Sequence, residues 1–337
     1  MPFGCQIRMA FLIRKNQEEN MRFTNIKDEM AYSEKRHTLK KDIEDMVMKK
    51  DYKNYEPGII EDYDKYIQIN TRSNKKSIVK VMNANGSISI LRPDITSNLL
   101  NNLLPRWQAG LKLKIFYYEK IFKQSGESIK EIRQMGVECL GMNTVASDRE
   151  IILLANEILS RYRTNYVLEI GSSEYLKGLL NEFYLEEDEY HQILYFIDRK
   201  NKQDLKRFIK GFEKNEAYEA LINLIDLKGE PFEVIERAKT GFLNEKMQKG
   251  LDELTEIITF KDTSDFKETL CDLSMVSSLG YYSGIMLRGY YRDSNREIIK
   301  GGRYDTYTEQ FGDVIPAIGF SVEMDELLRV LYEGGEI

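Results

Sequence analysis

The most constraining feature of the sequence is the order in which its hydrophobic patterns occur. Apolar and polar residues alternate, as in strands, in several segments between residues 77 and 141 and again at 281–288 and 317–322. Between these regions, residues 174–266 have a mainly helical periodicity rich in Leu, Lys and Glu. This order predicts one sheet built from distant parts of the chain, with a helical domain inserted between them. A chain of 337 residues is long enough for such an α+β fold.

The clearest local signal is a β-hairpin over residues 77–91. Two alternating segments flank Asn85-Gly86, a pair that supplies the positive φ of a tight turn. The hairpin leads into Arg92-Pro93-Asp94-Ile95-Thr96, after which apolar residues recur at helical spacing up to Trp107. Asp94 and Thr96 are therefore predicted to lie at a strand-to-helix junction.

Further elements follow from the same two periodicities. Residues 33–50 predict an amphipathic helix, and residues 111–117 and 131–141 predict two strands that pair antiparallel. The glycines of Lys300-Gly301-Gly302-Arg303-Tyr304-Asp305 are interpreted as a turn that begins a helix. A last amphipathic helix is predicted at 323–332.

Composition excludes several classes of protein. The net charge of −6, with both signs spread along the chain, disfavours a nucleic-acid partner. The longest apolar runs are too short for a membrane helix or a signal peptide, so a cytoplasmic protein is expected. Cys5, Cys139 and Cys271 lie far apart and are expected to be reduced thiols. The two histidines, His37 and His191, lie among polar residues, and we expect exposed positions and no metal site.

Polar residues on one strand give the first indication of a binding site. In Glu131–Gly141, the two-residue period places Gln134, Gly136 and Glu138 on the same face. The glycine would leave room for a small ligand between two polar groups, although an ordinary half-exposed strand has the same pattern. Tyr281 and Tyr282, between two glycines, could form aromatic walls of a pocket or belong to the core.

Taken together, several segments resemble a known family. They are LRPDIT (91–96), FYYEKIFK (116–123), IRQMGVECLG (132–141), LGYYSGI (279–285), GGRYD (301–305) and PAIGFSVEMDELL (316–328). Their order and spacing resemble the catalytic domain of class II histidyl-tRNA synthetases. This resemblance implies a class II aminoacyl-tRNA synthetase-like antiparallel sheet flanked by helices, with its core at 22–165 and 275–337 and a helical insertion at 166–274. Residues 1–21 are interpreted as an N-terminal extension.

The chain ends soon after Leu328, where that family continues into an anticodon-binding domain. We therefore expect no such domain. A synthetase-like core without it is similar to the family of ATP phosphoribosyltransferase regulatory subunits, which act in histidine biosynthesis.

The resemblance implies a pocket for histidine and no catalytic residues. Its histidine-binding residues would be Asp94, Thr96, Lys123, Gln134, Glu138, Tyr281 and Tyr282. Asp94, Thr96 and Gln134 would hold the α-ammonium group, since it needs oxygen acceptors. Glu138 and the two tyrosines would face the imidazole, and Lys123 would be the cation left for the carboxylate.

The residues that activate the amino acid in a synthetase are replaced. Arginines expected by resemblance fall on Lys123, Ser277 and Glu326, and Glu323 stands where the family has a glycine. Ser128, Lys130 and Gly280 also depart from the family pattern. Each lost charge-assisted contact removes about 1.5–3 kcal/mol of interaction, so we expect negligible adenylation and no cofactor.

The leading hypothesis is a non-catalytic regulatory subunit. It would assemble with the short-form catalytic subunit of ATP phosphoribosyltransferase as a homodimer core within a hetero-octamer, and it would transmit feedback inhibition by L-histidine as an allosteric effector. One alternative is a divergent histidyl-tRNA synthetase-like enzyme that activates an amino acid. A second alternative is a stand-alone histidine-binding module with another partner.

Overall fold

The structure, a computed structural model, describes residues 25–70, 74–260, 266, 268–277, 280–294 and 296–333. Its centre is a nine-stranded sheet with the order β1-β5-β6-β12-β11-β10-β7-β9-β8. The strands are β1 (Lys53–Asn54), β5 (Leu113–Ser125), β6 (Ser128–Leu140), β7 (Tyr166–Ser172), β8 (Lys228–Gly229), β9 (Thr269–Asp272), β10 (Ile285–Tyr291), β11 (Ile299–Arg303) and β12 (Ala317–Glu323). Neighbours run antiparallel except β1 with β5 and β7 with β9, so the predicted antiparallel sheet has two parallel pairs.

The discontinuous sheet predicted from the sequence is confirmed. β5 and β6 form the expected antiparallel pair, in register from Leu113 opposite Leu140 to Ser125 opposite Ser128. β12, from the end of the chain, lies against β6. The predicted hairpin is also confirmed: β3 (Lys80–Met82) pairs with β4 (Ile88–Leu91), and β2 (Ile60–Asp62) completes a small three-stranded sheet.

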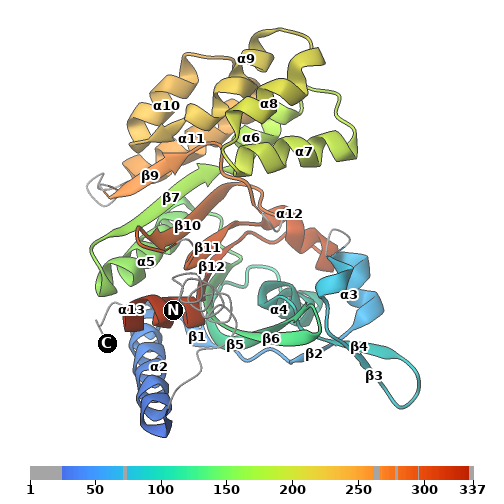
Figure 1. Cartoon of the computed structure of the whole chain (residues 1–337), viewed down its shortest axis with the longest axis vertical. Coiled ribbons are helices and arrows are strands. Elements are labelled where there is room, and N and C mark those ends of the chain that lie inside the picture. The colour runs from blue at the N-terminus through green and yellow to red at the C-terminus, as the bar shows by residue number, and fades with distance from the viewer. Residues whose placement is uncertain are drawn as a thin grey trace, which may run out of the picture.

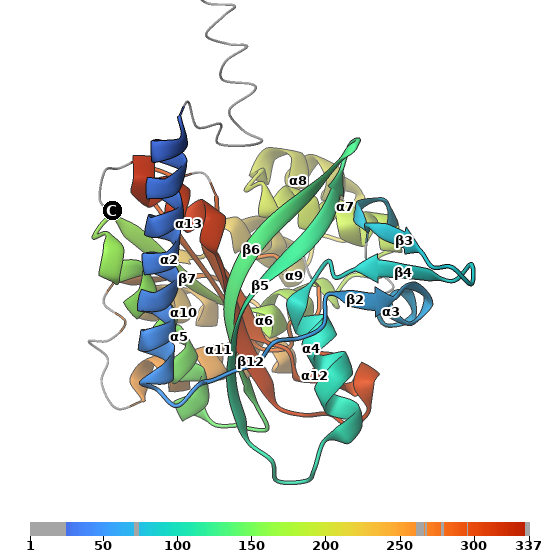
Figure 2. The same ribbon diagram turned by 90° about the horizontal axis from the view of Figure 1, so that it is seen from below.

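Side-chain alternation along the central strands separates the two faces of the large sheet. Phe116 of β5 packs in the core beneath α2 (Ile26–Met48), α5 (Val145–Tyr162) and α13 (Met324–Glu333). Ile115 and Tyr117 point to the opposite face and pack with α4 (Ile95–Leu103). Figure 2 shows α2, α5 and α13 on one side of β5 and β6 and α4 on the other. The face beneath α4 carries the residues predicted to bind a ligand.

The helical domain gathers at one end of the molecule, beyond β7 and β9 (Figure 1). Its helices are α6 (Ser173–Leu180), α7 (Glu187–Asp198), α8 (Lys202–Phe208), α9 (Glu216–Asn223), α10 (Pro231–Lys239) and α11 (Glu245–Thr259). The predicted insertion at 166–274 also contains β7, β8 and β9, which join the large sheet. β7 is almost wholly buried, so it lacks the alternation by which strands are recognised. The domain boundaries themselves stay a prediction.

Two local predictions were wrong. The strand expected at Tyr281–Arg288 begins only at Ile285, and the two tyrosines lie in the preceding loop. Gly301 and Gly302 belong to strand β11, and the short helix α12 (Asp305–Thr308) begins only after it. A Cβ on Gly301 would lie 2.2 Å from the backbone oxygen of Gly319 on β12. The glycine is therefore required by the close approach of two strands. In the sequence, this non-local requirement looks the same as a glycine turn.

The remaining expectations concern exposure and termini. His37 and His191 are exposed, and Cys139 and Cys271 are buried free thiols. Cys5 and the extension at 1–21 lie outside the described residues. Within the described part of the chain, no helix is both long and apolar enough to cross a membrane. α3 (Tyr63–Ile69) packs on the small sheet.

Gly301→Ala is expected to destabilise the protein by roughly 1–3 kcal/mol, because the new methyl group would overpack the contact between β11 and β12. Thermal and urea unfolding measure the change. Gly211→Ala is the matched control, since a Cβ there meets no atom within 4 Å. Equal stability of the two variants would contradict this account of Gly301.

Candidate functional site

The site begins at the junction between β4 and α4, which a buried arginine holds in place. Arg92 donates to the backbone oxygens of Lys120 (2.8 Å) and Pro57 (2.5 Å) and pairs with Glu119. Asp94 is the N-cap of α4, and its Oδ1 accepts the backbone N–H of Ser97 at 2.6 Å. This cap fixes where the helix starts and places Thr96 in its first turn.

Glu138 lies at the centre of the site. Its carboxyl is buried, and it accepts one hydrogen bond from Thr96 Oγ1 (2.8 Å) and one from Tyr304 Oη (2.5 Å). A Cβ on Gly319 would lie 1.9 Å from Glu138 Oε2, so the strand opposite must have glycine at that position. Because each carboxylate oxygen can accept a second bond, Glu138 retains acceptor capacity for a ligand N–H.

The electrostatics of the site favour a cationic or hydrogen-bond-donating ligand. Burial raises the pKa of Glu138 to about 7, although Tyr304 and Thr96 oppose the shift, and the nearby Asp94 raises it further. Burial also raises the pKa of Asp94, whereas the Ser97 N–H and the charges of Lys123 and Lys300 lower it. Two carboxyl groups in one buried region create an excess of acceptors.

Aromatic side chains form the wall of the site. The Tyr281 ring stacks on Tyr307 with 4.5 Å between centroids and meets Tyr282 edge-on at 5.0 Å. Tyr307 donates to Asn70 Oδ1 at 2.6 Å, which ties the wall to the end of α3. Burial raises the pKa of Tyr281 well above its ordinary value, so the phenol stays neutral. Such a wall suits a flat ring.

The space over Gly136 is already filled. The sequence predicted that this glycine leaves room for a ligand, but a Cβ there would lie 2.3 Å from the Tyr117 ring and hydroxyl. Tyr117 is directly opposite Gly136 in the β5–β6 register and belongs to the neighbouring strand. The glycine therefore accommodates a phenol of the protein, and the prediction about its role was wrong.

Gln134 belongs to an adjoining polar group. Its Nε2 donates to Glu323 Oε1 at 2.7 Å, and Lys300 Nζ donates to the same oxygen at 3.0 Å. The acceptor that Gln134 can still offer is its amide oxygen. Lys123 is half-buried on β5, where its charge reaches Asp94.

Six of the seven predicted residues lie in one connected group. Lys123, Glu138, Tyr281 and Tyr282 interact with the charge of Asp94, and Thr96 donates to Glu138. The seventh, Gln134, is connected to the group through Glu323 and Lys300. Sequence reasoning missed Tyr304, Tyr307, Tyr117 and Lys300 as parts of the site. Tyr304 stands in the GGRYD segment, but only the structure shows that its hydroxyl reaches Glu138.

The two acidic replacements behave differently. Glu326 accepts hydrogen bonds from Ser294 (3.1 Å) and Arg329 (2.5 Å). Burial alone would raise the pKa of Glu326, but Arg329 and Ser294 outweigh it and the pKa is lowered. Its charge is therefore balanced locally. Glu323 instead accepts hydrogen bonds from Gln134 and Lys300, so of the two replacements it is the one that contacts a predicted site residue.

A cavity of about 450 Å³ adjoins the site. Tyr282, Ser277 and Lys300 line it from the core, and His191 and Tyr195 line it from α7 of the helical domain. The cavity thus lies between the sheet and the insertion. Its volume is sufficient for a small metabolite.

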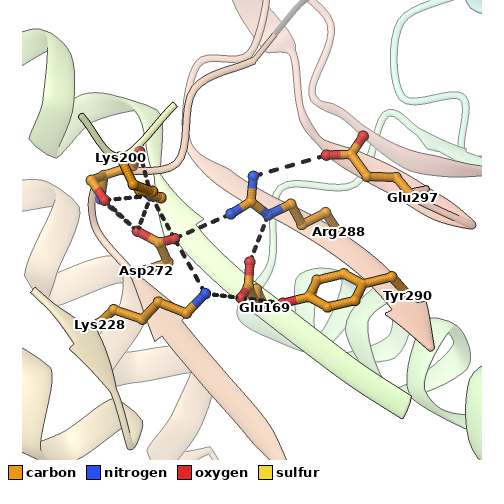
Figure 3. Close-up of polar contacts among 8 residues, drawn as sticks. Glu169, Lys200, Lys228, Asp272, Arg288, Tyr290 and Glu297 are labelled. Atoms are coloured by element: carbon orange, nitrogen blue, oxygen red, sulfur yellow. Dashed lines mark hydrogen bonds and ion pairs between the residues drawn. The ribbon is translucent and has the colours of Figure 1, made fainter. Parts of the chain in front are cut away.

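An ion cluster beside this cavity joins the helical domain to the sheet (Figure 3). Arg288 of β10 donates to Glu169 Oε2 at 2.6 Å and to Asp272 Oδ2 at 3.2 Å. Lys200, which follows α7, donates to Asp272 at 2.8 Å, and Lys228 pairs with Glu169. Burial alone would raise the pKa of Glu169 and of Asp272, but these cations outweigh it and both pKa values are lowered. The charges of the cluster are therefore compensated within the protein.

No group of three or more His, Cys, Asp or Glu suited to a metal ion occurs among the described residues. The arrangement is that of a binding site rich in neutral and anionic acceptors.

Comparisons with known proteins identify relatives of the chain. The sequence model of the family described as histidyl-tRNA synthetase matches residues 29–327. A curated relative named ATP phosphoribosyltransferase regulatory subunit, from Acetivibrio thermocellus, is 32% identical over 304 residues, which is 87% of this chain and 72% of the relative.

Two solved structures share the fold. One is an ATP phosphoribosyltransferase regulatory subunit/histidyl-tRNA synthetase from Bacillus halodurans, with a TM-score of 0.81 and 23% identity, covering 93% of this chain and 82% of that one. The other is an ATP phosphoribosyl transferase (HisG:HisZ) complex from Thermotoga maritima, with a TM-score of 0.64 and 18% identity, covering 86% of this chain and 97% of that one.

Arg288→Met is expected to destabilise the protein by about 3 kcal/mol, because it leaves two buried carboxylates short of a counter-ion. Since the pKa values of Glu169 and Asp272 are lowered in the folded protein, their contribution is present at neutral pH and is lost in acid. The difference in unfolding free energy between Arg288→Met and wild type should therefore decrease as the pH falls below 4. Urea unfolding at several pH values tests this, with the exposed Arg292→Met as control.

Glu138→Gln is expected to gain stability relative to wild type as the pH rises. The folded-state pKa of Glu138 is about 7 against an ordinary 4.5, so the wild-type protein holds a proton that the unfolded chain releases. Wild-type stability should therefore fall between pH 4.5 and 7 by up to about 3 kcal/mol relative to the variant. If the stability difference between Glu138→Gln and wild type does not change with pH, Glu138 is charged in the folded protein over this pH range.

Proposed function

Since the chain belongs to the family of ATP phosphoribosyltransferase regulatory subunits, which has the histidyl-tRNA synthetase fold, we propose that its buried acceptor site binds free L-histidine. The chain is a non-catalytic, regulatory component of histidine biosynthesis, and a catalytic subunit is its partner. The effector, the site residues and the stoichiometry are the parts of the proposal that go beyond this family membership.

The observation that carries the proposal is the Glu138 carboxyl, buried between two hydroxyl donors and next to aromatic rings. A histidine imidazole supplies an N–H for the remaining lone pairs of Glu138 and a flat ring for the tyrosine wall. Asp94, Thr96 and the amide oxygen of Gln134 would accept from the α-ammonium group. Lys123 and Lys300 are the cations available for the histidine carboxylate.

The binding of histidine changes the activity of a partner only if the ligand prefers one arrangement of the complex. The cavity beside the site is lined by both the sheet and α7, so a ligand there would contact both parts. A change in the position of the helical domain on the sheet would transmit that preference to the partner subunit. This step rests on the proposed histidine site.

The remaining parts of the proposal follow from the family resemblance. We expect a short-form catalytic subunit, a homodimer core within a hetero-octamer, and a cytoplasmic location. The alternative function, amino-acid activation, is disfavoured because Ser277 and Glu326 stand where the resemblance expects arginines. Glu326 also forms ion pairs with Arg329 and Arg296. Histidine-dependent pyrophosphate exchange by the purified chain would favour that alternative.

Glu138→Ala is expected to abolish most histidine-dependent inhibition of the complex, because the ring N–H loses its buried acceptor. Calorimetric titration with L-histidine, with other amino acids and ATP as controls, should show at least a tenfold loss of affinity. Assembly with the catalytic subunit should persist. Asp313→Asn, which changes an exposed carboxylate, should behave as wild type. Unchanged inhibition in Glu138→Ala would place the histidine site elsewhere.

A further inference from the structure

A second cavity, of about 420 Å³, lies on the far side of α4. It is formed between α4 and the segment that carries β2 and the start of α3. Its polar lining consists of the acids Glu61 and Asp62, the amides Asn98, Asn101 and Asn102, and the cations Lys65 and Arg106. None of the seven residues assigned to histidine lines this cavity, so it is a separate site.

Glu61 is the unusual residue of this cavity. Its side chain is 8% exposed, and its Oε1 has no hydrogen-bond partner among the described residues. Arg92 is the buried cation nearby, but its guanidinium is engaged by Glu119 and by the backbone oxygens of Pro57 and Gly58. A buried carboxyl oxygen without a partner is costly, so it indicates a missing donor.

The rest of the lining supplies further acceptors. Asn98, Asn101 and Asn102 follow an i, i+3, i+4 spacing and therefore share one face of α4. Each amide oxygen can accept a hydrogen bond, and the exposed Asp62 adds a second carboxylate at the rim. Organic cations with several N–H groups match such a set of acceptors.

We propose that this cavity binds a guanidinium or ammonium group, with Glu61 as its counter-ion and the asparagines of α4 as additional acceptors. The cation can belong to a free amine or guanidine, or to an arginine or lysine side chain of the catalytic subunit. Both sources present the same chemistry to Glu61. This inference does not rest on the proposed histidine site, so either of the two can fail alone.

The ionisation of Glu61 agrees with this geometry. Burial raises the pKa of Glu61 to about 7, and Asp94 raises it further, while Asn98, Arg92 and Lys65 lower it. Asp62, Lys65 and Arg106 are the other charged groups that line the cavity. A bound cation would lower the pKa of Glu61 and displace its proton. The affinity for the cation should therefore increase from pH 6 to pH 8.

The first test is calorimetric titration of the full chain with methylguanidinium chloride and methylammonium chloride, with uncharged methylurea as the control ligand. Glu61→Gln keeps the size of the side chain and removes its charge, and we expect at least a tenfold loss of affinity. Asn101→Leu fills the cavity without changing Glu61 and should give a similar loss. Asp64→Asn removes an exposed carboxylate nearby and should bind as wild type. Circular dichroism and histidine titration check that each variant is folded.

The second test measures assembly of the same variants with the catalytic subunit by sedimentation. A tenfold weaker assembly of Glu61→Gln, together with competition by methylguanidinium, assigns the cation to a side chain of the partner. Fragment binding lost in Glu61→Gln with unchanged assembly assigns it to a free molecule. The proposal is overturned if Glu61→Gln binds the fragments as wild type does, or if wild type shows neither fragment binding nor a Glu61-dependent assembly. Binding of Ca²⁺ or Mg²⁺ in their place also overturns it.

Discussion

The contact on which the site depends is that of the Glu138 carboxyl with two hydroxyl groups and one glycine. Thr96 reaches it from α4, Tyr304 from the end of β11, and Gly319 gives it room on β12. A buried carboxyl is stable only where such donors are fixed in place. The contact therefore links the beginning, middle and end of the core around one group. It also explains why the sheet must be assembled from distant parts of the chain before the site exists.

The parts of the fold that could be predicted are those that local pattern determines. The β5–β6 pair, the hairpin at Asn85-Gly86 and the cap at Asp94 all follow from nearby residues. Contacts between distant segments could not be predicted in this way. In the sequence, Gly301 resembles a turn residue. The contact that requires a glycine there, with the backbone oxygen of Gly319, comes from another strand. Gly136 appeared to leave an open space because Tyr117 lies on the neighbouring strand.

The same distinction applies to the site and its charges. Asp94, Thr96 and Glu138 were predicted through their motifs, and the structure brings them together. The tyrosine at 304 and the ion cluster of Glu169, Asp272 and Arg288 were not predicted, because their partners are far apart in sequence. The roles of the two acidic residues that depart from the family pattern also needed the structure. Glu326 is neutralised by Arg329, whereas Glu323 holds Gln134 and Lys300.

Helix α4 connects the two sites by its geometry. Its cap and first turn carry Asp94 and Thr96, and the face with Asn98, Asn101 and Asn102 lines the second cavity. The charge of Asp94 also raises the pKa of Glu61. A cation at Glu61 would reduce the negative potential felt at Asp94 and so weaken its attraction for an ammonium group. By linkage, histidine would then weaken cation binding by the same factor. If that cation is a side chain of the partner, this antagonism couples the effector directly to the subunit contact.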